Sequence, residues 1–151
     1  MRGSRPSTQT LLLDTNVFIS AIKNPLTETE TLRLVLKILQ DPTLQLVGNQ
    51  IQAEEKVRYA EELHSETAAT LLQALLSKTR IVTVRKNLIT VCQSYIEASE
   101  KADIINAATC LQTDATLITN DHHYDQIRDQ QIIPVWSTSK AIQTLLPKKE
   151  E

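Results

Sequence analysis

Short apolar runs alternate along the chain with longer stretches that have the spacing of amphipathic helices. The apolar runs predict strands at residues 10–13, 44–48, 80–84, 116–119 and 132–135. The other stretches predict helices over residues 26–40, 50–77, 88–97, 101–112, 122–128 and 137–146. Regular alternation of strand and helix is typical of an α/β domain with a parallel sheet.

The chain has 151 residues, a length that suits one domain with a core of ordinary size. We expect this domain over residues 10–147, with a disordered polar tail at residues 1–9 and a frayed, charged end at residues 148–151. No apolar run approaches the roughly 20 residues that span a bilayer, and the first nine residues lack the apolar segment of a signal peptide. The sequence therefore predicts a soluble, cytoplasmic protein without membrane contact.

Composition and charge exclude some functions without naming one. The formal net charge of −2 gives no overall basic surface of the kind that marks many nucleic-acid-binding proteins. The only glycines are Gly3 and Gly48, so the glycine-rich loops that bind dinucleotides or nucleotide phosphates are excluded. Cys92 and Cys110 have no CxxC spacing, and we interpret them as buried free thiols.

Two of the predicted strands run directly into aspartates. Residues 11–13 are followed by Asp14, and residues 116–119 are followed by Asn120 and Asp121. In open parallel sheets, ligands bind beyond the carboxyl ends of the strands. A pair of carboxylates at such an edge indicates a metal ion.

Three further acids are candidates for the same edge. Asp103 falls in the first turn of the helix over 101–112, where the helix dipole also favours a carboxylate. Glu54 and Glu55 lie in a helix that begins just after the second strand, and adjacent helix positions allow at most one of them to face a shared site. With no cysteine or histidine at metal-ligand spacing, these oxygen ligands suit Mg²⁺ or Mn²⁺ rather than Zn²⁺. Such ions position water for attack on phosphorus, so the set indicates phosphodiester hydrolysis.

Four blocks of sequence combine these acids with their neighbours: residues 11–19, Glu54-Glu55, residues 102–108 and residues 117–124. In order and spacing the blocks resemble the PIN domain family, whose members include the toxin ribonucleases of VapBC toxin–antitoxin pairs. The resemblance covers nearly the whole chain. It implies a three-layer α/β/α fold with a five-stranded parallel sheet in the order 3-2-1-4-5. The strand before Asp14 then lies beside the strand before Asp121, about 4.8 Å away.

The resemblance also implies roles for the acids. Asp14, Asp103 and Asp121 correspond to metal ligands, and Glu55, or alternatively Glu54, to the glutamate that positions water. Carboxylates packed so closely repel one another, and we expect at least one to take up a proton unless a cation is present.

Polar neighbours complete the predicted site. Thr15, Asn16 and Thr119 are expected to support the acids, with helix capping and strand-end hydrogen bonding as equal alternatives. For His122 and His123, exposed loop positions are favoured over catalytic ones.

Our leading hypothesis is a Mg²⁺- or Mn²⁺-dependent endoribonuclease that acts on single-stranded RNA. If the protein is a toxin of this family, the resemblance implies an antitoxin in the cleft and a homodimer; a non-toxin RNA-processing nuclease is the alternative. A catalytically silent module that binds RNA or protein is a hypothesis from another class. A phospho-receiver domain is disfavoured because the strand over 80–84 is followed by no aspartate to phosphorylate.

Overall fold

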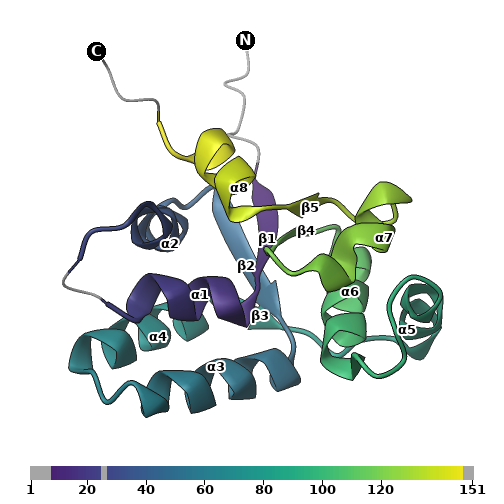
Figure 1. Cartoon of the computed structure of the whole chain (residues 1–151), viewed down its shortest axis with the longest axis horizontal. Coiled ribbons are helices and arrows are strands. Elements are labelled where there is room, and N and C mark those ends of the chain that lie inside the picture. The colour runs from purple at the N-terminus through teal and green to yellow at the C-terminus, as the bar shows by residue number, and fades with distance from the viewer. Residues whose placement is uncertain (1–7, 25–26, 148–151) are drawn as a thin grey trace, which may run out of the picture.

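In the computed structural model, which describes residues 8–24 and 27–147, five parallel strands form one sheet in the order β3-β2-β1-β4-β5 (Figure 1). The strands are β1 (Gln9–Leu13), β2 (Leu44–Gly48), β3 (Thr79–Ile81), β4 (Thr116–Ile118) and β5 (Val135–Trp136). β1 pairs with β4 so that Leu13 lies opposite Ile118. The expected order is therefore confirmed, and the strands that precede Asp14 and Asp121 are neighbours.

Helices cover both faces of the sheet and enclose two hydrophobic clusters (Figure 1). The first cluster is built with α1 (Thr15–Ile22), α2 (Glu30–Gln40), α3 (Gln50–Glu62), α4 (Glu66–Lys78) and α8 (Thr138–Leu145). The second is built with α5 (Lys86–Gln93), α6 (Lys101–Thr113), the 3₁₀ helix η1 (His122–Tyr124) and α7 (Asp125–Asp129). Side chains alternate across a strand, so Leu11 and Leu13 pack into the first cluster and Leu12 into the second.

Helix α1 was not predicted, and its sequence explains why. Thr15, Val17, Phe18 and Ile19 are β-branched or aromatic residues with low helix propensity. The helix forms because tertiary burial outweighs that preference: Val17, Phe18 and Ile22 are almost completely buried in the first cluster. Its placement directly after β1 turns the chain away from the sheet at Asp14.

Other boundaries also differ from the predictions. The helix predicted from residue 26 begins at Glu30, because the Thr29 side chain accepts a hydrogen bond from the Leu32 N–H and caps it; residue 26 lies outside the described residues. The helical stretches predicted over 50–77 are the two helices α3 and α4, and Ser65 caps the second. The strand predicted over 80–84 ends at Ile81.

The last strand and the chain ends also differ in part from the predictions. β5 starts at Val135 rather than at residue 132, because Pro134 has no N–H to donate to a strand ladder. Residues 1–7 and 148–151, most of the predicted tails, lie outside the described residues, whereas Gln9 already belongs to β1. Within the described part of the chain, no helix is long and apolar enough to cross a membrane.

Candidate functional site

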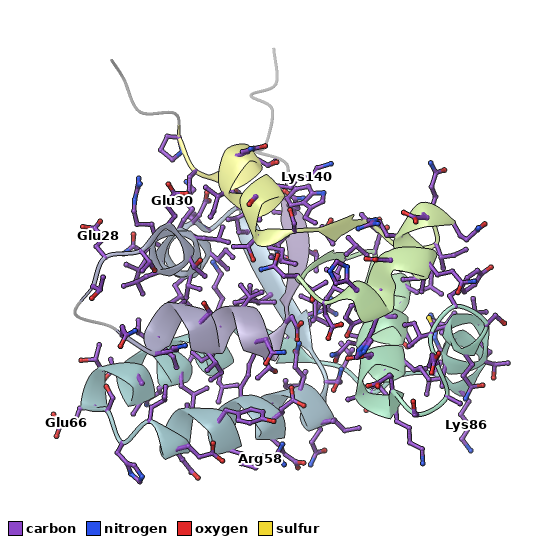
Figure 2. All side chains as sticks on the ribbon, viewed as in Figure 1. Glu28, Glu30, Arg58, Glu66, Lys86 and Lys140 are labelled. Atoms are coloured by element: carbon purple, nitrogen blue, oxygen red, sulfur yellow. The ribbon has the colours of Figure 1, made fainter. Side chains whose placement is uncertain are left out.

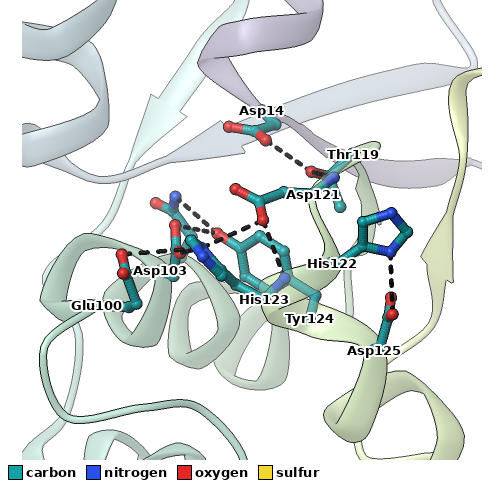
Figure 3. A network of polar contacts seen from close by, with 10 residues as sticks. Asp14, Glu100, Asp103, Thr119, Asp121, His122, His123, Tyr124 and Asp125 are labelled. Atoms are coloured by element: carbon teal, nitrogen blue, oxygen red, sulfur yellow. Dashed lines mark hydrogen bonds and ion pairs between the residues drawn. The ribbon is translucent and has the colours of Figure 1, made fainter.

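Asp14 and Asp121 meet at the carboxyl edge of the sheet, where Thr119 joins them (Figure 3). Asp14 directly follows β1 and is only 8% exposed. Its N–H donates to the Ile118 carbonyl across 3.0 Å, which holds it beside β4. The Thr119 hydroxyl donates to Asp14 Oδ2 at 2.6 Å and accepts from the Asp121 N–H at 3.0 Å. One hydroxyl therefore fixes the spacing of two predicted metal ligands.

Asp103 reaches the same edge from the first turn of α6 and is held from two sides. Its Oδ1 accepts a hydrogen bond from the Tyr124 hydroxyl at 2.9 Å, and its Oδ2 lies 2.7 Å from His123 Nδ1. The same Nδ1 lies 3.2 Å from Asp121 Oδ1 and 3.7 Å from Glu100 Oε2 (Figure 3). His123 thus lies between two of the predicted ligands.

The histidine was not expected in the site. His123 is exposed, as predicted, but donor atoms of Glu100, Asp103 and His123 lie within 4.8 Å of one another. The hydrogen bond to Asp103 raises the pKa of His123, with Asp121 and Glu100 adding to the effect. Position 123 follows Asp121 by two residues, and that proximity was the one signal in the sequence that could have identified it.

A buried chain of polar side chains supports Asp103 from behind. Asn106 Nδ2 donates to the Tyr124 hydroxyl at 3.3 Å, and Asn49 Nδ2 donates to Asn106 Oδ1 and to Thr109 Oγ1, each at 3.0 Å. Burial raises the pKa of Tyr124, so its hydroxyl remains a donor. This series of hydrogen bonds links α3, α6 and η1 to the carboxylate of Asp103.

The two glutamates of α3 do not join the aspartates. Glu54 is exposed, and its Oε1 accepts a hydrogen bond from Gln50 Nε2 at 3.0 Å. Glu55 is half-buried. Among the described residues, neither makes a hydrogen bond or an ion pair with Asp14, Asp103 or Asp121.

The face of α3 that turns towards β1 carries Gln52 and Lys56 instead. Gln52 Nε2 donates to the carbonyl of Leu13, the residue before Asp14, across 3.0 Å. Lys56 lies one turn further along the helix and is 3% exposed. Burial lowers the pKa of Lys56 to about 8, while the nearby charges of Asp14 and Glu55 act in the opposite direction.

The acidic edge is electrostatically costly without a bound cation. Burial raises the pKa of Asp14, and the charges of Asp103 and Asp121 raise it further. The Thr119 hydrogen bond and the charge of Lys56 oppose this shift without reversing it. This is the effect expected from closely packed carboxylates.

A cavity of about 230 Å³ opens beside these carboxylates, with Asp14, Asn16, Asn120 and Asp121 in its lining. Asp14 Oδ1 and Asp121 Oδ2 have no hydrogen-bond partner among the described residues. Two free carboxylate oxygens on one cavity, in a site that disfavours uncompensated negative charge, fit a hard divalent cation.

The three polar residues expected to support the site have different surroundings. Thr119 bridges the aspartates and exposed Asn16 lines the cavity, while the buried hydroxyl of Thr15 has no partner within the described ranges. A wider depression, of about 670 Å³, extends from Glu100 and His123 towards α5.

Solved structures with the same fold include three bacterial complexes. VapBC2 from Rickettsia felis, bound to a promoter DNA fragment, has a TM-score of 0.57 and 15% identity, covering 85% of this chain and 98% of that chain. FitAcB from Neisseria gonorrhoeae has a TM-score of 0.54 and 22% identity, covering 85% and 98%. VapBC-1 from nontypeable Haemophilus influenzae has a TM-score of 0.57 and 19% identity, covering 87% and 100%.

Sequence comparisons give a family but no individual relative. A search of curated proteins found no match. The model of the PIN domain family matches residues 11–130, which include the three aspartates, Thr119 and His123. Because this match spans most of the chain, the protein belongs to the PIN domain family.

Proposed function

We propose that the protein is a metal-dependent endoribonuclease that hydrolyses phosphodiester bonds in single-stranded RNA. PIN domains are generally nucleases. The observation that carries the proposal is the placement of Asp14 and Asp121 on one cavity, each with a free carboxylate oxygen and both bonded to Thr119. This arrangement suits a reaction in which a bound cation places positive charge beside a phosphate.

The aspartates are the residues that would hold Mg²⁺ or Mn²⁺, Asp14 and Asp121 through their free oxygens and Asp103 in place of its contact with His123. The bound cation would supply charge neutralisation at the phosphate and orientation of the attacking water. Thr119 keeps Asp14 and Asp121 in register, and Tyr124 keeps one oxygen of Asp103 fixed. Of the two glutamates, half-buried Glu55 is the better candidate for positioning water in the RNA complex.

The test is cleavage of a mixed set of labelled single-stranded RNAs with Mn²⁺ and then with EDTA. We expect cleavage by the native protein with Mn²⁺ only, and loss of about 100-fold or more in the Asp14→Asn and Asp121→Asn variants. The matched control is Asp114→Asn, which also removes one carboxylate. Asp114 follows α6 at its other end, about 16 Å along the helix axis from Asp103.

Full cleavage in both site variants, with contaminating nuclease excluded, would overturn the proposal. Absence of both cleavage and carboxylate-dependent Mn²⁺ binding would favour the alternative of a silent module that binds RNA or protein.

The proposal extends to protein partners. The structural neighbours are VapBC and FitAcB complexes, and by analogy we expect an antitoxin polypeptide that covers the acidic cavity, together with self-association as a homodimer. Light scattering of the purified chain tests the dimer. Inhibition of cleavage by a co-purified partner, relieved when that partner is removed, distinguishes a toxin from an RNA-processing nuclease.

A further inference from the structure

Lys56 is a buried cation for which the proposed reaction has no role so far. It is 3% exposed, and within the described part of the chain its ammonium group makes no hydrogen bond and no ion pair shorter than 4 Å. A buried charge without a close partner lowers stability, so the burial of Lys56 needs an electrostatic explanation. The acidic edge provides one, because Asp14 and Glu55 are the charges that act on Lys56.

The position of Lys56 determines what it can act on. Gln52, one turn earlier on the same face of α3, is hydrogen-bonded to the residue before Asp14. Lys56 therefore lies on the face of α3 that turns towards Asp14, and it is not among the residues that line the cavity. Because only 3% of the residue is exposed, we expect Lys56 to act through the charge of Asp14 rather than by direct contact with RNA.

We propose that the buried ammonium group of Lys56 is a fixed counter-ion of Asp14 that weakens metal binding and limits the aspartate cluster to one divalent ion. The three aspartates and Glu100 are the acids of this edge, and Lys56 is its buried base, so the lysine offsets one of the negative charges that a second divalent ion would need. Without the lysine the cluster has a full extra negative charge close to the metal position. Lys56 is thus a positioning residue in the site, and this inference rests on the proposed metal-dependent function.

Calorimetric titration of the full chain with Mn²⁺ tests the inference without any measurement of cleavage. The native protein is expected to bind about one Mn²⁺ per chain. The Lys56→Met variant, which keeps the length of the side chain without its charge, is expected to bind the first Mn²⁺ about tenfold more tightly. The Lys56→Arg variant keeps the charge and is expected to bind as the native protein does.

The matched control is Lys86→Met, which removes the same unit charge from an exposed position at the start of α5 (Figure 2). It should leave the Mn²⁺ affinity unchanged. Circular dichroism verifies the fold of each variant, and Lys56→Gln replaces Lys56→Met if the latter does not fold.

Two results would overturn the inference. If the native protein binds Mn²⁺ and Lys56→Met binds it with the same affinity, Lys56 is not a counter-ion of the metal site, while the proposed nuclease stands. If no variant binds Mn²⁺, the inference and the metal-dependent function fail together.

Discussion

The ionised carboxylate of Asp14, a residue of the candidate site, destabilises the folded protein. It is buried next to two other carboxylates, so the folded protein favours its protonated form. A group whose pKa is raised by folding adds stability below its unfolded pKa and loses that stability as the pH rises through its folded pKa. At neutral pH the carboxylate of Asp14 therefore lowers the stability of the metal-free protein.

We predict that Asp14→Asn raises the melting temperature in EDTA at pH 7. Asparagine has nearly the same shape and still accepts from the Thr119 hydroxyl, but it cannot ionise. The advantage of the variant should be smallest below pH 3.8, the ordinary pKa of the aspartate, and should grow as the pH rises. Thermal melts from pH 3.5 to 7 measure this, and a variant less stable than the native protein at pH 7 would contradict it.

Buried polar side chains tie helices α3, α6 and η1 together. Asn49 caps α3 through the Gln52 N–H and also bonds to Asn106 of α6, which in turn bonds to Tyr124 of η1. Buried hydrogen bonds of this kind orient the helices relative to one another more sharply than hydrophobic contact alone. The position of Asp103 thus depends on three elements.

Loss of the Tyr124 hydroxyl from this series of hydrogen bonds should lower the stability of the protein measurably. We predict that Tyr124→Phe destabilises the protein by about 1–3 kcal/mol, because Asn106 and Asp103 each lose a partner. The melting temperature should fall by roughly 2–4 °C for each kcal/mol. Tyr95→Phe is the control, since the Tyr95 hydroxyl makes no hydrogen bond to any described residue. Equal melting temperatures for the two variants would contradict the prediction.

Strand β1 contributes side chains to both hydrophobic clusters. Leu12 belongs to the second cluster, whereas Leu11, Leu13 and the only tryptophan, Trp136, belong to the first or pack against it. A loss of packing on one face therefore weakens the strand on which the other face depends.

We predict that Leu12→Ala costs about 2–5 kcal/mol and shifts two unfolding curves together. One is Trp136 fluorescence, which reports on the first cluster, and the other is far-ultraviolet circular dichroism, which reports on all helices. If the fluorescence transition stays at its native midpoint while the dichroism transition moves, the two faces unfold independently.

The strand-end aspartates could be predicted from sequence because parallel strands place their carboxyl ends at one edge whatever the loops do. Asp103 followed from its place in the first turn of a helix at the same edge. Helix α1 could not be predicted, because local propensity opposes it and only burial of Val17 and Phe18 explains it.

The orientation of α3 could not be predicted for a related reason. Its inward face is marked by Gln52, Lys56 and Ala60, of which only Ala60 is apolar, so hydrophobic periodicity gave no guide to the choice between Glu54 and Glu55. The contacts of His123 and Tyr124 depend on how η1 packs on α6, which no spacing in the sequence reveals.

The dual use of β1 limits how this protein can diversify. A substitution in residues 11–13 disturbs one of the two clusters and the strand that presents Asp14, so variants there should be lost before any change in specificity can be selected. The rim of the wider depression is different: Gln126 and Glu97 are exposed and take part in neither cluster. Under the proposed ribonuclease function, new RNA preferences, whether natural or selected in the laboratory, should therefore arise on this rim while β1 stays constant.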